Sequence, residues 1–135
     1  MGARIIGTGS AVPITCLTND EIAKRVDTNH NWIVTRTGIE ERRVITQDES
    51  VLDLVHEASL KALESSGLSP DKLDAILVAT VSGEYAFPST ACLLQARLGI
   101  DNVPAFDIAA ACAGFVYGLS VAHSYIKSGD YNNIL

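Results

Sequence analysis

The sequence contains no long apolar run, no basic stripe and no short-period repeat. No apolar stretch reaches the ~18 residues that a membrane-spanning helix requires, and the amino terminus lacks the long apolar core of a signal peptide. The formal net charge is −6, and the lysines and arginines are dispersed, which disfavours nucleic acid and anionic membranes as main partners. We therefore expect a globular protein that binds neither nucleic acid nor membrane.

Cysteine is scarce, with three residues among 135. An odd count without a regular framework is typical of a reducing compartment, so we expect a cytoplasmic protein. Cys16 lies in an expected loop and has no partner at the spacing of a metal or redox motif, and we expect no metal site. Cys92 falls within a helical apolar pattern, where core filling is its expected role.

Short apolar strands alternate with helical patterns along the chain. We expect strands over residues 3–8, 39–45, 75–81 and 106–110, and helices over residues 18–26, 31–35, 50–66, 88–99 and 112–129. This alternation is typical of an α/β fold whose parallel strands are joined by crossover helices. A further apolar segment begins at residue 133, so we expect residues 1–135 to form one domain that is incomplete at its carboxyl end.

Cys112 lies where an expected buried strand gives way directly to an apolar helix. Residues 108–111 carry no polar side chain, and Val116, Leu119 and Ile126 follow at helical spacing. The unpaired N–H groups and the positive dipole end of a helix start stabilise a thiolate, which is the nucleophilic form of cysteine. Cys112 is therefore our candidate nucleophile, and a small buried packing residue is the alternative.

Three stretches occur in the order and spacing of one enzyme family: Ile6 to Ser10, Trp32 to Ile39, and Asp107 to Phe115. Over all 135 residues the sequence closely resembles β-ketoacyl-acyl-carrier-protein synthase III, which starts bacterial fatty-acid synthesis by condensing an acyl-CoA primer with malonyl-carrier protein. The resemblance implies a thiolase-like fold of stacked α-β-α-β-α layers and a homodimer. This chain would be most of the amino-terminal half of that fold.

The resemblance also implies roles for individual residues. Cys112 would take the acyl group from acyl-CoA, with acetyl-CoA as the expected primer, and pass it to the carbanion that malonyl-carrier protein forms. Trp32 and Arg36 would grip the nucleotide end of coenzyme A, Thr28 would hydrogen-bond the adenine, and Phe87 would line the acyl pocket of the partner subunit. Coenzyme A enters only as the substrate thioester, and no cofactor is implied.

In the family, the catalytic histidine and asparagine come from the second half of the fold. None of His30, His56 and His123 matches that histidine, so we expect this chain alone to be inactive. His30 is expected in a polar loop, and the other two on helices.

Other functions stay open beside this one. A related thiolase-fold condensing enzyme of secondary metabolism is the nearest alternative, and a non-catalytic binding or dimerisation module is another. A papain-like cysteine hydrolase is disfavoured because its nucleophile motif is absent. Without the resemblance, Trp32 and Arg36 would be read as a buried aromatic anchor and a surface cation, and Phe87 could equally belong to the core.

Overall fold

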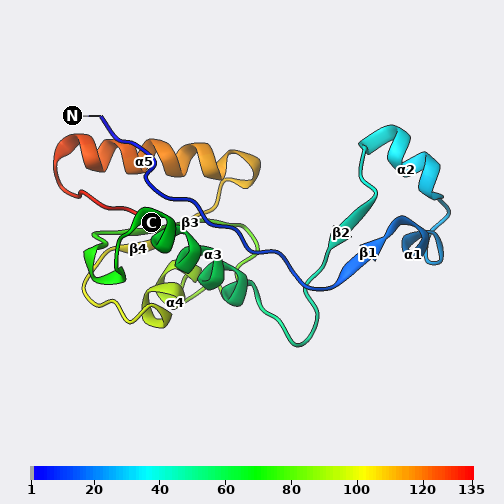
Figure 1. Cartoon of the computed structure of the whole chain (residues 1–135), viewed down its shortest axis with the longest axis horizontal. Helices are drawn as coiled ribbons and strands as arrows, with labels where there is room; N and C mark the ends of the chain where they lie inside the picture. Colours follow the sequence, from blue (N-terminus) through cyan, green and yellow to red (C-terminus); the bar gives the residue numbers. More distant parts are fainter. Residues whose placement is uncertain (1) are drawn as a thin grey trace. The chain divides into compact units, whose positions relative to one another are not determined.

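The computed structural model describes residues 2–135 and divides the chain into two compact units. The smaller unit comprises residues 12–50, and the larger unit comprises the residues up to Ala11 together with residues 51–135. Each unit contains one small two-stranded sheet (Figure 1).

The smaller unit contains two antiparallel strands, and two short helices lie between them in the sequence. Its elements are β1 (Cys16–Thr18), α1 (Asn19–Ala23), α2 (His30–Thr37) and β2 (Glu41–Arg43). The expected capping box forms at the start of α1: the backbone N–H of Thr18 donates to Glu21 at 2.8 Å, and the Thr18 hydroxyl accepts from the Glu21 N–H. At the end of α2, Gly38 has a φ of 71°, a left-handed conformation that suits glycine.

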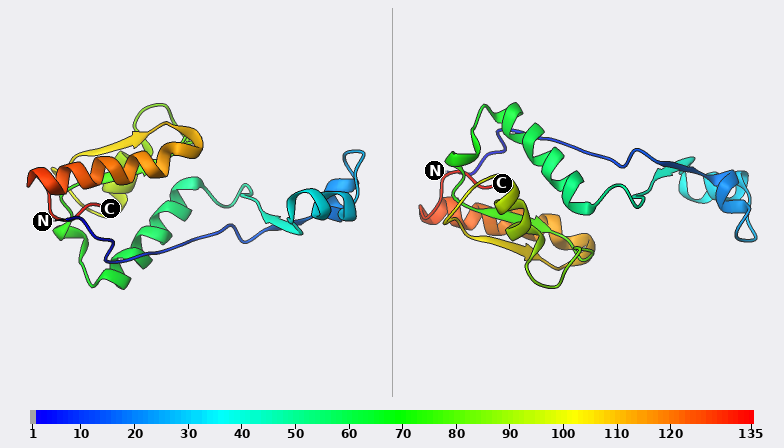
Figure 2. Two further views of the ribbon diagram at one scale, coloured as in Figure 1. Left: turned by 90° about the horizontal axis from the view of Figure 1, so that it is seen from above. Right: turned by 90° about the horizontal axis from the view of Figure 1, so that it is seen from below.

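The larger unit is a parallel strand pair between helices. Its elements are α3 (Val51–Ser66), β3 (Ile76–Ala79), α4 (Thr90–Arg97), β4 (Ala105–Ile108) and α5 (Gly114–Ser128), with 3-10 turns at Pro70–Lys72 and Ala111–Ala113. Figure 1 shows α5 on one side of the strand pair, and α3 and α4 on the other. Both views of Figure 2 show α5 running alongside the strands. This layering confirms the α/β class.

The core of the larger unit lies between the strand pair and helices α3 and α4. Its buried members are Leu63, Leu73, Ile76, Ala91, Leu94 and Ile100. Full burial of one large apolar side chain contributes about 1.5–3 kcal/mol, so this cluster holds α3 and α4 against the strands.

The expected strand after residue 133 begins where the sequence indicates. Ile134 forms a parallel bridge with Ala75, the Leu77 N–H donates to the Leu135 carbonyl at 2.8 Å, and the Leu135 N–H donates to the Ala75 carbonyl at 3.1 Å. Strand β3 therefore has a parallel neighbour on each side, which explains its continuous apolar sequence.

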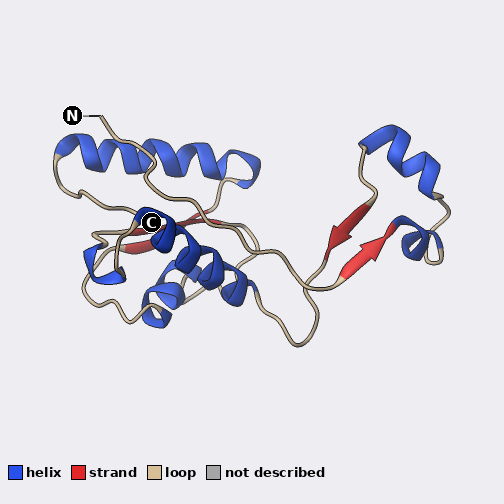
Figure 3. Cartoon of the chain, in the orientation of Figure 1, coloured by secondary structure: helices blue, strands red, loops and turns tan. Residues whose placement is uncertain are grey.

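The expected strand over residues 3–8 is wrong. These residues have no strand partner within the described chain, and Figure 3 draws the segment as loop. Gly7 and Gly9 instead bring the backbone against helix α3, where an added Cβ would collide with the carbonyl oxygens of Ala62 and Ala58. A strand needs a hydrogen-bonded neighbour, and an apolar pattern alone does not supply one.

Several element boundaries also differ from the expectation. Helix α1 stops at Ala23 rather than residue 26, and α2 is longer than residues 31–35. Strands β2, β3 and β4 are shorter than expected, and Val81, expected in a covered strand, is 69% exposed in the loop after β3. Within residues 2–135, no helix has the length and apolar content that crossing a bilayer requires.

Candidate active site

Cys112 lies in the 3-10 turn Ala111–Ala113 that joins β4 to α5, and its side chain is exposed. Ala111 has a φ of 44°, which is uncommon for a residue with a Cβ and marks a sharp change of chain direction just before the thiol. The alternative of a buried packing residue is therefore wrong for Cys112.

Gly114 fixes the turn against the sheet. A Cβ at this position would lie 3.3 Å from the Cβ of Ala79 and 3.5 Å from the carbonyl oxygen of Ile108, so a side chain would push the helix start away from β3. The thiol consequently sits beside the carboxyl ends of two parallel strands. Open α/β sheets bind their ligands at this edge.

The start of α5 differs slightly from the expectation. Its first residue is Gly114, two positions after Cys112, and Ala113 as N-cap supplies no side-chain hydrogen bond to the helix. No side chain at the N-cap therefore accepts from the first N–H groups of α5. The positive end of the α5 dipole lies next to the turn that holds Cys112. Cys112 therefore precedes α5 and does not open it, which corrects the expected helix start.

The other two cysteines occupy structural positions. The thiol of Cys92 on α4 donates to the carbonyl of Ala105 at 3.3 Å and is partly buried, which agrees with the expected packing role. Cys16 is the first residue of β1 rather than part of a loop. A hydrogen bond with Glu41, together with desolvation, raises the pKa of the Cys16 thiol and so disfavours its thiolate.

Trp32 and Arg36 form a stacked pair on the exposed face of α2. The guanidinium carbon of Arg36 lies 4.8 Å from the centroid of the indole ring, and Trp32 is 53% exposed. The expected shared face is confirmed, and the alternative of a buried aromatic anchor is wrong. The pair borders a shallow hollow of about 320 Å³, also lined by Asn29, Asn31 and Thr35.

The structure places Thr28 and Phe87 very differently. The Thr28 hydroxyl oxygen is buried and has no hydrogen-bond partner among the described residues. Phe87 lies in the loop between β3 and α4 and is 89% exposed, so the alternative of a core residue is wrong. Thr28, Trp32 and Arg36 belong to the smaller unit, and Phe87 and Cys112 to the larger one.

None of the three histidines lies in the turn that holds Cys112. His30 is the first residue of α2 rather than part of a loop, and His56 and His123 lie on α3 and α5 as expected. Across residues 2–135, no three His, Cys, Asp or Glu side chains come together in a way that could hold a metal ion.

Two polar arrangements, one at the partly buried Asp107 and one at the buried Asn19, were not predicted from the sequence. Asp107 on β4 accepts from the N–H groups of Thr90 at 2.9 Å and Ala91 at 2.8 Å, which ties the start of α4 to the strand that leads to Cys112. Asn19 joins three segments of the smaller unit through its side-chain amide. Neither residue stands in a sequence pattern that signals such contacts, because the partners are distant along the chain.

A profile of the family 3-oxoacyl-[acyl-carrier-protein] synthase III matches residues 106–135, which include the thiol turn. The chain is 52% identical over 133 residues to the β-ketoacyl-[acyl-carrier-protein] synthase III of Xanthomonas campestris, and 53% identical over 135 residues to that of Pseudoalteromonas atlantica. The chain closely resembles the synthase III proteins over nearly all of its own length. The expected resemblance is thereby confirmed.

Solved structures of synthase III family members share the fold of this chain. The 3-oxoacyl-[acyl-carrier-protein] synthase III of Aquifex aeolicus superimposes with a TM-score of 0.95 at 49% identity, covering 98% of this chain and 43% of that protein. A priming β-ketosynthase of a polyketide biosynthetic pathway superimposes with a TM-score of 0.89 at 37% identity, covering 93% of this chain and 38% of that one. The thiolase-like fold expected from the sequence agrees with these superpositions.

The chain spans about two fifths of the length of its synthase III relatives. The match covers 98% of this chain but 41% of the Xanthomonas campestris protein, and 100% of this chain but 42% of the Pseudoalteromonas atlantica protein.

Proposed function

We propose that the protein containing this chain is a β-ketoacyl-acyl-carrier-protein synthase III that carries its acyl intermediate on Cys112. One observation carries the proposal: Cys112 is an exposed thiol in the turn between a parallel strand and the start of α5. The similarity to synthase III proteins supports the same chemistry. Acetyl-CoA or another short acyl-CoA is the proposed primer, and the proposed location is the cytoplasm.

In the first half-reaction, the thiolate of Cys112 attacks the thioester carbonyl of the primer. A carbon–sulfur bond forms at Cys112, the bond to the coenzyme A sulfur breaks, and coenzyme A leaves as a thiolate that takes a proton from water. One thioester replaces another, so the step changes bond energy little and suits a sulfur nucleophile.

In the second half-reaction, malonyl-carrier protein loses carbon dioxide, and the electron pair left on its α-carbon attacks the acyl carbonyl. The new carbon–carbon bond forms as the bond to the Cys112 sulfur breaks, which regenerates the thiolate. The backbone N–H of Cys112 is the proposed donor to the oxyanion, and loss of one such donor typically slows catalysis about 100- to 1,000-fold. Because no histidine of this chain matches the family's catalytic one, the chain alone should form no ketoacyl product.

The stacked pair on α2 is proposed to bind the nucleotide end of coenzyme A. An exposed indole offers a flat surface to the adenine, and the guanidinium beside it can meet a phosphate or the base. Thr28 would also contact the adenine, although its buried hydroxyl must first rotate outward. The exposed ring of Phe87 suits insertion into the acyl pocket of the partner subunit in a homodimer.

A condensing enzyme of secondary metabolism is the second candidate. The similarity to the priming β-ketosynthase of a polyketide pathway favours it, because that protein shares 37% of the aligned residues and the same fold. Turnover of different acyl-CoA primers and carrier proteins by the full-length protein distinguishes the two candidates.

The proposal is tested by mixing the full-length protein with acetyl-CoA and malonyl-carrier protein and measuring ketoacyl product. Cys112→Ser should lower the rate on the order of 10,000-fold or more, as expected for removal of a nucleophile. Cys92→Ser is the matched control, because its thiol only donates to a backbone carbonyl. Equal rates for the Cys112→Ser variant and the wild type would contradict the proposal.

A further inference from the structure

Asn19 is the most buried polar side chain of the smaller unit, with 0% exposure. Its Oδ1 accepts a hydrogen bond from Nη1 of Arg42 at 2.7 Å. Its Nδ2 donates to the carbonyl oxygen of Ile39 at 2.8 Å and faces Nδ1 of His30 at 3.5 Å. Loss of one of these hydrogen bonds would leave a buried polar group without a partner, which is unfavourable.

The partners of Nδ2 lie at opposite ends of helix α2. His30 is the first residue of that helix, and Ile39 directly follows Gly38, the residue that ends it. Asn19 itself is the first residue of α1. One side chain therefore contacts the segments at both ends of the helix that carries Trp32 and Arg36.

Besides the contacts of Asn19, helix α2 has an N-cap, in which the Asn29 side chain accepts from the Trp32 N–H at 2.9 Å, and the left-handed Gly38 at its end, but it buries little of its surface. It is eight residues long, and Ile33 is the buried residue that the helix contributes to the unit. Isolated helices shorter than about 12–15 residues are marginal in water, so α2 depends on contacts with its surroundings. Polar contacts through Asn19 consequently carry more weight here than they would in a helix with a broad apolar face.

We propose that Asn19 is a positioning residue that fixes α2, and with it the stacked pair Trp32 and Arg36, through its side-chain amide. The expected effect of Asn19 on coenzyme A binding rests on the proposed function, in which this pair binds the nucleotide end. The expected effect of Asn19 on the geometry of the pair does not rest on that function, because it follows from the contacts of Asn19 alone.

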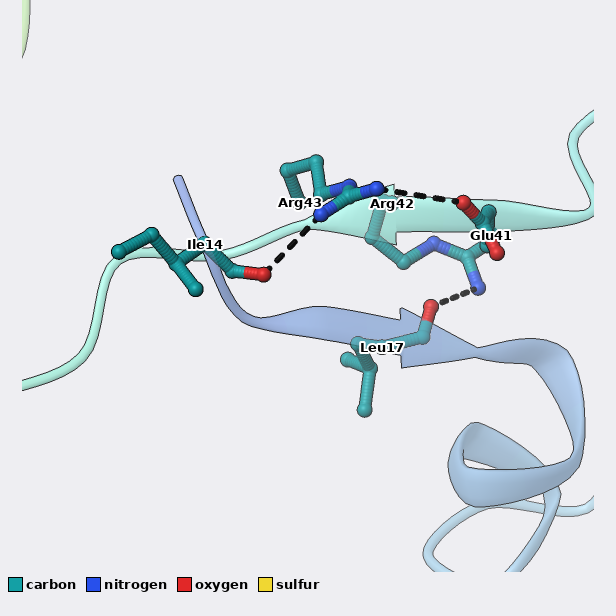
Figure 4. Close-up of polar contacts among 5 residues, drawn as sticks. All are labelled: Ile14, Leu17, Glu41, Arg42 and Arg43. Carbon is teal, nitrogen blue, oxygen red and sulfur yellow. Dashed lines mark hydrogen bonds and ion pairs between the residues drawn. The ribbon is translucent and has the colours of Figure 1, made fainter. Parts of the chain in front are cut away.

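Two adjacent arginines of β2 provide a matched comparison (Figure 4). Arg42 donates from Nη1 to the Leu17 carbonyl at 3.4 Å as well as to Asn19. Arg43 donates to the Ile14 carbonyl at 3.0 Å and lies 3.9 Å from the Glu41 carboxylate. Removal of Arg42 thus leaves a buried acceptor on Asn19 unpaired, whereas removal of Arg43 does not.

The test uses the full-length protein. Trp32 is the single tryptophan of residues 1–135, so its fluorescence reports on α2 once any tryptophan outside these residues is replaced by phenylalanine. The variants are Asn19→Ala, Asn19→Asp, Arg42→Met and the control Arg43→Met. Asn19→Asp keeps an acceptor for Arg42 but loses the donor to Ile39. This variant therefore tests the hydrogen bond to Ile39 while the acceptor for Arg42 is kept. The readouts are acrylamide quenching of Trp32 fluorescence, amide hydrogen exchange in α2, and the Kd for coenzyme A.

We expect Asn19→Ala, Asn19→Asp and Arg42→Met to increase quenching and to speed exchange in α2, with Arg43→Met close to the wild type. Coenzyme A should bind about 10-fold more weakly to the first three, the change expected for one lost buried hydrogen bond. Exchange in α5 of the larger unit should stay unchanged in all four, which separates a local effect from general unfolding.

Unchanged quenching and exchange in the Asn19 variants would overturn the positioning role. So would an Arg43→Met variant that behaves like Arg42→Met, or the same loss of protection in α5 as in α2. If the quenching results hold but the wild-type protein binds no coenzyme A, the positioning role stands and the proposed nucleotide contact fails.

Discussion

Gly114 sets how closely the thiol turn approaches the sheet. An alanine there would place its Cβ 3.3 Å from the Cβ of Ala79, closer than ordinary van der Waals contact, whereas an alanine at Gly118 would meet Ile108 at 3.9 Å. We expect Gly114→Ala to lower the free energy of unfolding by about 1–3 kcal/mol through overpacking. Gly118→Ala should raise it by up to about 1 kcal/mol, because alanine favours the helix interior.

Urea denaturation of the two variants and the wild type measures this difference. Equal stabilisation by both substitutions would show that the start of α5 does not press against β3.

The capping box of α1 makes this helix sensitive to pH. Hydrogen bonds from the backbone N–H and then the hydroxyl of Thr18 lower the pKa of Glu21 below its ordinary value. A carboxylate with a depressed folded-state pKa stabilises the fold above its unfolded pKa, and this stabilisation is lost as the pH falls through the folded value. We expect the start of α1 to loosen in acid, below the usual titration range of glutamate.

NMR titration of the Glu21 carboxyl and amide exchange in α1 test this expectation. In Glu21→Gln the acid-dependent part of the exchange should disappear. A Glu21 that titrates at or above its ordinary value would contradict the assigned capping role.

At the scale of elements, Asp107 links α4 to β4. Both of its carboxylate oxygens accept backbone N–H groups at the start of the helix, from Thr90 and Ala91. Asp107→Ala leaves these donors unpaired, and we expect a loss of about 1–3 kcal/mol in the free energy of unfolding. The exposed Asp101 provides the control, since Asp101→Ala should change stability by less than about 0.5 kcal/mol.

Thermal or urea unfolding measures both variants. A similar effect of the two substitutions would indicate that the carboxylate of Asp107 does not hold the start of α4.

Elements whose ends are encoded locally were predictable from the sequence. Thr18 caps α1 through side chains within three residues, and Gly38 and Gly67 end α2 and α3 in left-handed conformations. Strand pairing was less predictable, because residues 3–8 carry a strand-like pattern without finding a partner in the described chain. Pairing depends on which segments meet in space, and the local pattern does not contain that information.

The same distinction applies to the candidate site. Cys112 could be picked out because it lies at the boundary between two expected elements, whereas Trp32 and Arg36 were singled out by the resemblance. Asn19 and Asp107 could not be picked out, since each contacts backbone groups 16 to 20 residues away in the chain. Such long-range contacts are harder to predict from the sequence than a position at an element boundary.

At the scale of the whole molecule, the proposed chemistry is divided between the two units. The thiol turn and Phe87 belong to the larger unit, and the stacked pair Trp32 and Arg36 belongs to the smaller one. Neither unit alone contains all of the residues in the proposed function. The identity of the acylated residue is the central question.

The most direct measurement is peptide mass spectrometry of the full-length protein after incubation with isotope-labelled acetyl-CoA. We predict label on the peptide that contains Cys112, its loss in Cys112→Ser, and its retention in Cys92→Ser. Label on another residue, or label that persists in Cys112→Ser, would contradict the assignment of Cys112 as the acylated residue.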